Sequence, residues 1–312
     1  MNTLKSIGIY SICILLLSNC EPVLLNVDIP EINKMTVNSL FTTDSTWHVF
    51  VTKTEKIGDF VAGELTPIES ADVSIWENGQ KVTTLNYSGN LDAFGYMGLY
   101  KSTREAGVLP EVGKTYEIRV MANGYPNVIA KSIIPVPVEI NAIEIVSTAR
   151  NNRDEIPINI YFHDPVGVEN YYELAYATYS VWIGGDGAQR SEYNERTLFG
   201  HNFLYTSSGS VGIFNLDNIN RPVLFNDEGI DGNDLKVSVG LYFPVNDNPN
   251  ITIKTYVLLR TISKDYYNYK AKINLNNANN DDPFTEPVQL YGNIEGGLGI
   301  FAGYGRHIVE VK

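Results

Sequence analysis

The chain has 312 residues, a formal net charge of −13 at pH 7 and only two cysteines. Such an acidic surface repels phosphate backbones and anionic headgroups, which argues against nucleic acid as a partner. Two cysteines exclude metal sites of the cysteine-rich kind, and Cys13 lies in an N-terminal apolar run that we expect to be removed, so no disulfide can form within the mature chain. The fold must therefore depend on its apolar core, and the length is sufficient for two domains.

Residues 1–19 are typical of a bacterial secretion signal. A short basic start precedes an apolar run at 7–17, which is too short to cross a bilayer as a helix. The run ends in LSNC, which resembles the lipobox of bacterial lipoproteins, although Asn19 stands where Gly, Ala or Ser is usual. We therefore expect cleavage before Cys20 and lipid attachment to its sulfur. A plain secretory signal or a buried N-terminal strand is the alternative.

Residues 20–33 predict a lipidated tether, and the next region, 34–137, predicts a β-sandwich. Apolar residues alternate with polar ones in MTVNSLFTT, WHVFVTK, ADVSIW and TYEIRV, as in strands with one face in a core. Turn signals such as Asn78-Gly79 separate these runs. The pattern between 67 and 134 resembles the prealbumin-like, or carboxypeptidase-regulatory, type of sandwich. The prolines of PVPVEINAIEIV (135–146) suggest the domain boundary.

Residues 138–312 predict a second antiparallel β-sandwich or barrel with one helix. Alternation recurs at 156–162, 235–243 and 251–259. The helix is expected at 263–278, with Ser263 as its N-cap, Asp265 in its first turn, and Tyr266, Tyr269 and Ile273 at helical spacing. The predicted fold class is therefore mainly β, with two sandwich-like domains.

The stretch GLGIFA (297–302) matches the glycine pattern of a dinucleotide-binding loop. Such a loop needs a strand before it and a helix after it, whereas a final strand follows here. A glycine-lined bend is the favoured interpretation, and we expect no cofactor. At least one of the glycines should have a positive φ. Ile294, Leu298 or Phe301 should then close the end of the domain, and Glu295 should find a buried partner or backbone amides.

The acidic loop NDEGIDGND (226–234) offers carboxylate ligands for calcium, above all Asp227, Asp231 and Asp234. An EF-hand loop would need acids at alternating positions, a glycine at the sixth and a glutamate at the twelfth, and this spacing does not match. A solvated hairpin loop is therefore favoured over a metal site.

Aromatic residues gather in one predicted strand, which contains Tyr171, Tyr172, Tyr176, Tyr179 and Trp182. Flat rings with a polar group suit sugar faces and protein interfaces. Alternation divides these residues between two faces, so part of the set must be core.

The sequence holds few signs of catalysis. It has no G-x-S-x-G and no H-E-x-x-H, and its four histidines are scattered. His163 and Asp164 are adjacent, yet neighbours in a strand point to opposite faces. A glycosidase would need only two carboxylates, so an enzyme stays the third hypothesis.

The C-terminal region resembles a family of uncharacterised Bacteroidota outer-membrane lipoproteins. The similarity rests on DDPFTEPVQLYGNIEGGLGIFAGYG (281–305) and DPVGVENYYEL (164–174), with NIEGGLGIF (293–301) as its most specific part. No catalytic residues carry over. The motif positions, expected to be structural, are Asp282, Pro283, Phe284, Asn293, Ile294, Glu295, Gly296, Gly297, Gly299 and Phe301.

The resemblance also implies a partner, because members of that family are commonly encoded beside TonB-dependent receptors. We therefore expect a lipid-anchored outer-membrane protein that serves as a non-enzymatic accessory of such a receptor, on either face of the membrane. A glycan-binding or envelope-polymer-binding lipoprotein that acts alone is the alternative.

Overall fold

The computed structural model describes residues 33–55, 65–91, 96–103, 108–150, 155–198, 202–206, 209–214, 222–244, 248–279 and 289–312. The predicted signal and tether, the lipid-attachment residue Cys20, and three motif residues, Asp282, Pro283 and Phe284, lie outside these ranges. Within them the chain is mainly β, as predicted. No helix among these residues is long and apolar enough to cross a membrane.

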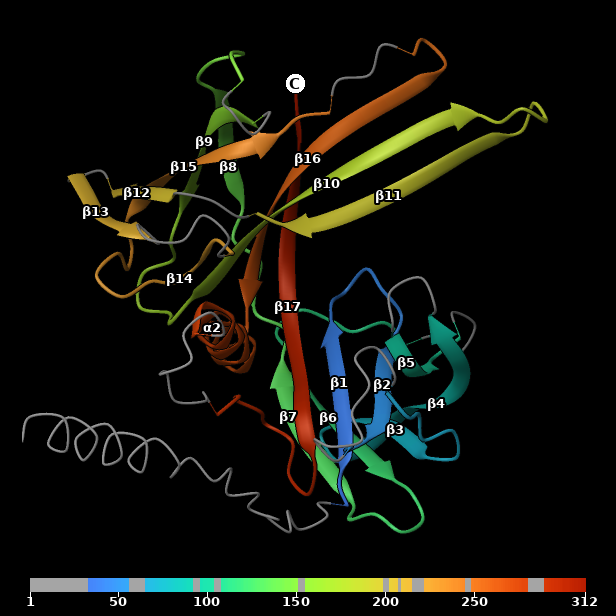
Figure 1. Ribbon diagram of the computed structural model, residues 1–312. Coiled ribbons are helices and arrows are strands. Elements are labelled where there is room, and N and C mark those ends of the chain that lie inside the picture. Colours follow the sequence, from blue (N-terminus) through green and yellow to red (C-terminus); the bar gives the residue numbers. More distant parts are fainter. Residues whose placement is uncertain are drawn as a thin grey trace, which may run out of the picture. The chain divides into compact units, whose positions relative to one another are not determined.

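The first sandwich contains strands β1 to β7, joined by the first half of the last strand, β17 (Leu298–Val311; Figure 1). Hydrogen-bonded neighbours follow the order β17-β1-β2-β5-β4-β3-β6-β7. The strands are β1 (Met35–Phe41), β2 (His48–Lys53), β3 (Asp72–Glu77), β4 (Gln80–Leu91), β5 (Tyr96–Lys101), β6 (Thr115–Met121) and β7 (Val128–Ile133).

Alternating burial along these strands confirms the predicted period of two. In β1, for example, Met35 and Val37 are fully buried while Leu40 is exposed. Aromatic rings fill the centre of the core: Phe41 stacks on Phe301 of β17 with ring centroids 4.6 Å apart. Burial of large rings dominates the stability of such a core.

The second sandwich packs a five-stranded sheet, β13-β12-β15-β9-β8, against the strands β11-β10-β16-β17. Its core contains Phe162, Tyr172, Leu174, Phe225 and Leu259. The strands are β8 (Ile140–Ile145), β9 (Glu155–His163), β10 (Tyr171–Ile183), β11 (Gln189–Thr197), β12 (Asn202–Thr206), β13 (Gly209–Phe214), β14 (Leu224–Asn226), β15 (Asp234–Tyr242), β16 (Ile251–Ile262) and β17 (Leu298–Val311).

The last strand belongs to both sandwiches. Residues 298–303 of β17 pair with β1 in parallel, and residues 304–311 pair with β16 in antiparallel. Phe301 is buried in the first core and Val311 in the second. Residues 33–312 accordingly form one compact unit, and the predicted division at residue 137 stays a prediction.

A three-stranded arm extends from the second sandwich (Figure 1). It consists of residues 176–183 of β10, 189–196 of β11 and 251–257 of β16, and it ends at the turn that joins β10 to β11. Side chains of β10 change from buried to half-buried as the strand enters the arm, because the five-stranded sheet no longer covers them.

Helix α2 (Lys264–Asn279) begins as the sequence predicts. The Ser263 Oγ accepts a hydrogen bond from the Tyr266 amide at 3.3 Å, which satisfies one of the free amides of the first turn. The Asp265 carboxylate accepts from Tyr291 and, at 3.2 Å, from Asn293. Tyr266 is buried as expected, whereas Tyr269 and Ile273 are only half-buried.

Candidate functional site

The motif NIEGGLGIF (293–301) joins the C-terminal part of the chain to the first sandwich, and we call this segment the glycine seam. The Glu295 backbone exchanges two hydrogen bonds with Ile129 of β7, at 2.9 and 3.2 Å. Three residues later the chain enters β17 and pairs with β1. Asn293 fixes the bend, because its side chain donates to the Phe301 carbonyl at 2.8 Å and accepts from the Phe301 amide at 2.9 Å.

Close backbone approach explains the glycines of this seam. As the sequence predicts, positive φ occurs here, at Gly296 (78°) and Gly299 (108°). A Cβ on Gly296 would lie 2.2 Å from the Asn127 carbonyl oxygen, and one on Gly299 would lie 2.2 Å from that of Val37. Only glycine permits this contact without displacement of the backbone.

The other motif residues divide between core and surface. Ile294 and Phe301 are buried, as expected. Leu298 is exposed and does not close the end of the domain. The Glu295 side chain is also exposed and so has no buried partner, whereas the Glu295 backbone bonds to β7.

The acidic loop meets a third aspartate from elsewhere in the chain. Carboxylate oxygens of Asp164, Asp227 and Asp231 lie within 4.8 Å of one another, which is a spacing that could hold a hard cation such as calcium. Asp234 is not part of this group. It is exposed and instead contacts His163 Nδ1 at 2.9 Å.

These three carboxylates also accept hydrogen bonds that join two loops. Asp164 accepts from the Tyr172 hydroxyl and from the Gly232 amide at 3.0 Å. Asp227 accepts from the Asn170 amide at 2.6 Å, and Asp231 accepts from an amide of the 165–170 loop at 2.7 Å. Burial raises the pKa of Asp164, and the charges of the other two aspartates raise it further. The three carboxylates therefore have a structural role, because they hold the two loops together.

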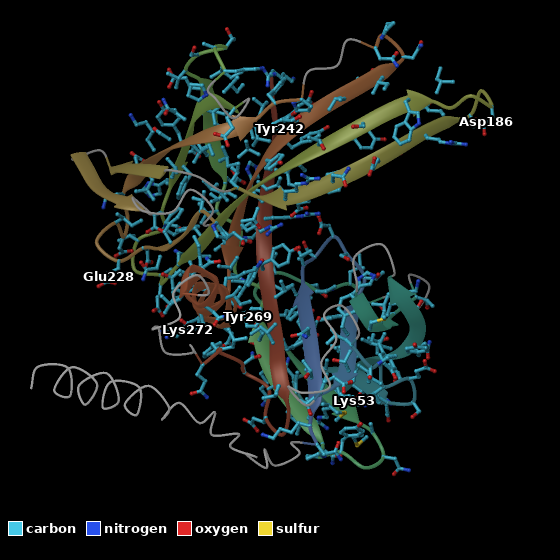
Figure 2. All side chains as sticks on the ribbon, in the orientation of Figure 1. Lys53, Asp186, Glu228, Tyr242, Tyr269 and Lys272 are labelled. Carbon is cyan, nitrogen blue, oxygen red and sulfur yellow. The ribbon has the colours of Figure 1, made fainter. Side chains whose placement is uncertain are left out.

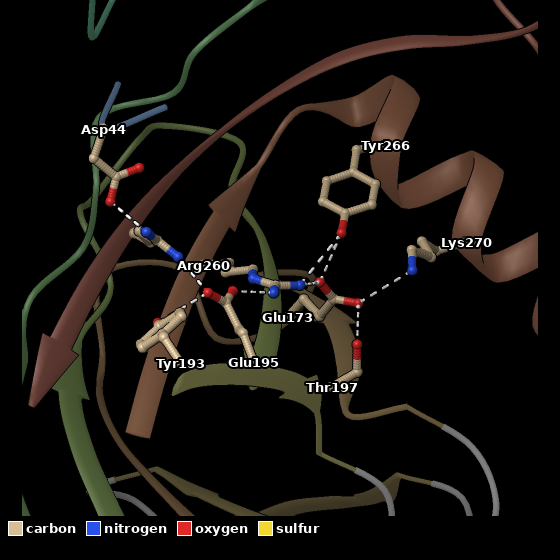
Figure 3. A network of polar contacts seen from close by, with 9 residues as sticks. Asp44, Glu173, Tyr193, Glu195, Thr197, Arg260, Tyr266 and Lys270 are labelled. Atoms are coloured by element: carbon tan, nitrogen blue, oxygen red, sulfur yellow. Dashed lines mark hydrogen bonds and ion pairs between the residues drawn. The ribbon is translucent and has the colours of Figure 1, made fainter. Parts of the chain in front are cut away.

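A buried network of charges lies where β10, β11, β16, β17 and α2 meet (Figure 3). At its centre, Glu173 is completely buried and accepts hydrogen bonds from Arg260 and, at 2.8 Å, from the Tyr266 hydroxyl. The Thr197 hydroxyl donates to Glu173 Oε1 at 3.5 Å, and Lys270 Nζ lies 3.9 Å from the same oxygen.

The network continues outward through alternating charges. Arg260 also contacts Glu195, Glu195 contacts Arg306 of β17, and Arg306 contacts Asp44 in the turn between β1 and β2. Burial opposes ionisation of Glu195, but the two arginines outweigh it and lower the pKa of the carboxyl. The chain of ion pairs thus connects the second sandwich to the first.

Two hollows are further candidate sites. The apolar groove has a volume of about 750 Å³ and lies between the connector 133–138, the loop 165–171 and the start of α2. Its exposed valines include Val136 (68% exposed) and Val168 (54%). At the rim, Lys264 pairs with Glu169 at 3.0 Å.

The arm cleft is smaller, about 480 Å³, and more polar. It lies where the arm meets the ends of β9 and β15, and it is lined by Glu155, Tyr176, Thr178, Ser180, Asn194, Arg196, Tyr242, Pro244 and Ile253.

The aromatic set of β10 divides as the alternation predicts. Tyr172 belongs to the second core, and Tyr171 packs on Tyr267 of α2 with ring centroids 4.8 Å apart. Tyr176 lines the arm cleft, while Tyr179 and Trp182 are half-buried on opposite faces of the arm.

Sequence reasoning missed the buried charges and the third aspartate. Glu173 in YYELAYA and Arg260 in VLLRTI stand alone inside apolar strands, which is the available signal for a buried pair. Asp164 lies about 60 residues before the acidic loop, so only the pairing of β9 with β15 brings it there.

A family model described as Domain of unknown function (DUF4249) matches residues 22–307. No curated protein matches the chain. The match covers both sandwiches, the arm and the glycine seam. The chain therefore belongs to the family of the domain of unknown function DUF4249.

Proposed function

We propose that this chain is a lipid-anchored cell-envelope protein that serves as a non-enzymatic accessory component of a TonB-dependent outer-membrane uptake system. The lipobox-like LSNC and the resemblance at 281–305 support the location and the type of partner. The apolar groove is the structural observation that carries the proposal, since it offers a surface for a protein partner.

The groove has the chemistry of a protein-docking surface. Its exposed valines, Val136 and Val168, come from two segments far apart in the sequence, and Ile133 beside them is 42% exposed. Contiguous apolar surface of this kind marks interaction sites in soluble domains. Burial of such a surface against a partner contributes about 25 cal/mol of binding free energy per Å² of apolar area removed from water.

The rim indicates the character of the partner segment. Glu139 is exposed beside the groove, and the whole chain is strongly acidic. An extended apolar segment of the receptor with basic flanking residues would complement both features.

A pull-down from detergent-solubilised envelopes tests this docking surface. We expect Val136→Lys with Val168→Lys to reduce recovery of the TonB-dependent receptor at least about tenfold, because charged ammonium groups would face the apolar segment. The matched control is Val146→Lys, since Val146 is 55% exposed but does not line the groove. Equal recovery with the double variant and the control would refute the proposed surface.

The membrane anchor has a separate test. Cys20→Ala removes the sulfur to which the lipid would attach, so we expect the protein to leave the outer-membrane fraction. If the variant still fractionates with the outer membrane after a carbonate wash, the anchor is wrong.

The second candidate function, glycan binding by a lipoprotein that acts alone, is favoured by the arm cleft. Receptor pull-down and sugar retention distinguish the two. Loss of the receptor without loss of sugar retention supports the accessory function.

A further inference from the structure

The arm cleft has a regular floor of polar and aromatic side chains. Tyr176 lies opposite Arg196 in the β10–β11 ladder, and Thr178 lies opposite Asn194. Because side chains alternate along a strand, these four share one face of the arm, and Ser180 follows on the same face. The floor therefore presents a ring and two hydroxyls from β10 beside an amide and a guanidinium from β11.

The wall of the cleft comes from the five-stranded sheet. Tyr242, at the end of β15, is 46% exposed, and Pro244 follows it in the lining. Figure 2 shows Tyr242 near the base of the arm and Asp186 at its tip. Glu155, at the start of β9, contributes a carboxylate. A ligand in the cleft would thus meet aromatic surface from the floor and from the wall.

This combination suits a saccharide. A sugar ring presents C–H groups on its faces, which pack on tyrosine and proline, and hydroxyls at its rim, which need donors and acceptors. Thr178, Ser180 and Asn194 supply both kinds of group at the floor. The cleft is open to solvent, so its ligand need not be enclosed on every side.

Arg196 supplies the cleft with a cation, in addition to the Glu155 carboxylate. Other arginines of the described chain, such as Arg190, Arg260 and Arg306, contact acidic side chains. Arg196 is exposed, and the described part of the structure gives it no ion pair. In a protein of net charge −13, a guanidinium that has no ion pair among the described residues and lies beside hydroxyls and rings offers a bidentate site for a carboxylate.

We infer that the arm cleft binds a carboxylate-bearing saccharide, with Arg196 on the carboxylate and with Tyr176 and Tyr242 against the sugar rings. The same face of the arm continues from Tyr176 to Trp182, a span of about 20 Å, which offers further aromatic surface to a polymer. This inference deepens the glycan-binding alternative and does not depend on the receptor partnership.

Calorimetric titration of the full-length protein in detergent tests the inference. The probe is tetragalacturonate, and the comparison ligand is the uncharged maltotetraose. We expect tetragalacturonate to bind and maltotetraose to bind at least about tenfold more weakly, since the neutral sugar cannot form the charge-assisted bonds. Binding should weaken as salt rises, because the cleft is solvated.

Two variants assign the site. Arg196→Gln should weaken tetragalacturonate binding about tenfold or more, and Tyr242→Ala should weaken both ligands. Lys272→Gln is the matched charge control, because Lys272 is exposed on α2 outside the cleft, and it should leave binding unchanged (Figure 2). Thermal melts that coincide with wild type show that the variants fold.

Several results would overturn the inference. Equal affinity for the charged and neutral sugars would remove the role of the carboxylate, and unchanged binding by Arg196→Gln would remove the site. No heat with either sugar at millimolar concentration would remove saccharide as the ligand class, even if the receptor pull-down succeeds.

Discussion

The two halves of β17 are held by different kinds of interaction. The first half, residues 298–303, is fixed to β1 and β7 by backbone contact, by glycines and by the buried ring of Phe301. The second half pairs with β16 and carries Arg306 into the buried charge network. An apolar core tolerates substitutions that conserve volume, whereas removal of one partner from a buried ion pair leaves an uncompensated charge. The two halves should therefore respond differently to substitution, pH and salt.

The largest effect is expected at the centre of the network. Glu173→Leu leaves Arg260 buried without its main counter-charge, which costs about 3–5 kcal/mol of unfolding free energy. Urea unfolding of the variant measures this loss.

The double variant sharpens that result. Glu173→Leu with Arg260→Leu removes both charges, and replacement of a whole buried pair by apolar residues is often neutral. We expect the double variant to be more stable than the single one. A double variant that is less stable than the single would show that Glu195 and Tyr266 still need the guanidinium.

A smaller effect is expected at the glycine seam. In Gly297→Val the new Cβ would lie 2.8 Å from the Met35 carbonyl oxygen and from Val128 Cγ2. We expect a loss of about 1–3 kcal/mol and a melting temperature several degrees lower. Gly185→Val is the control, because a Cβ there meets nothing within 4 Å. An unchanged melt together with lost receptor binding would make the seam a binding site instead.

A fall in pH should weaken the second half of β17, which carries Arg306 of the charge network, before it weakens the first half. The folded-state pKa of Glu195 lies below its ordinary value of 4.5, so the carboxylate stabilises the fold above that value and this contribution is lost as pH falls below about 4.5. The pKa of Asp164 is shifted in the opposite direction, so protonation of this residue at low pH favours the folded state. Glu195→Gln should therefore flatten the acid limb of the unfolding free energy against pH. A steeper acid limb in this variant would contradict the assignment.

The smallest effect is expected at the outer end of the network. The Asp44 side chain is 45% exposed, so its ion pair with Arg306 is screened by water. Asp44→Asn should cost about 1 kcal/mol or less, and the loss should shrink further in high salt. A loss as large as that of Glu173→Leu would mean that the turn between β1 and β2 is held mainly by this charge.

The strands and the helix could be predicted because their signals are local. Alternating side chains in MTVNSLF, the Ser263 cap and the glycines of NIEGGLGIF each report a backbone requirement within a few residues. Period two follows from the pleat, and positive φ follows from the lack of a Cβ. These features require no knowledge of what packs against them.

The candidate sites depend on contacts between distant segments, so only the tertiary structure determined them. Asp234 was the third candidate ligand in the acidic loop, but strand pairing brings Asp164 to Asp227 and Asp231 instead. Arg196 and Tyr242 are 46 positions apart in the sequence and meet only because the arm lies beside the end of β15. By itself the sequence determined which residues alternate, cap and bend. Charge pairs, clefts and the shared strand arise from pairing over long sequence separations, which local periodicity does not encode.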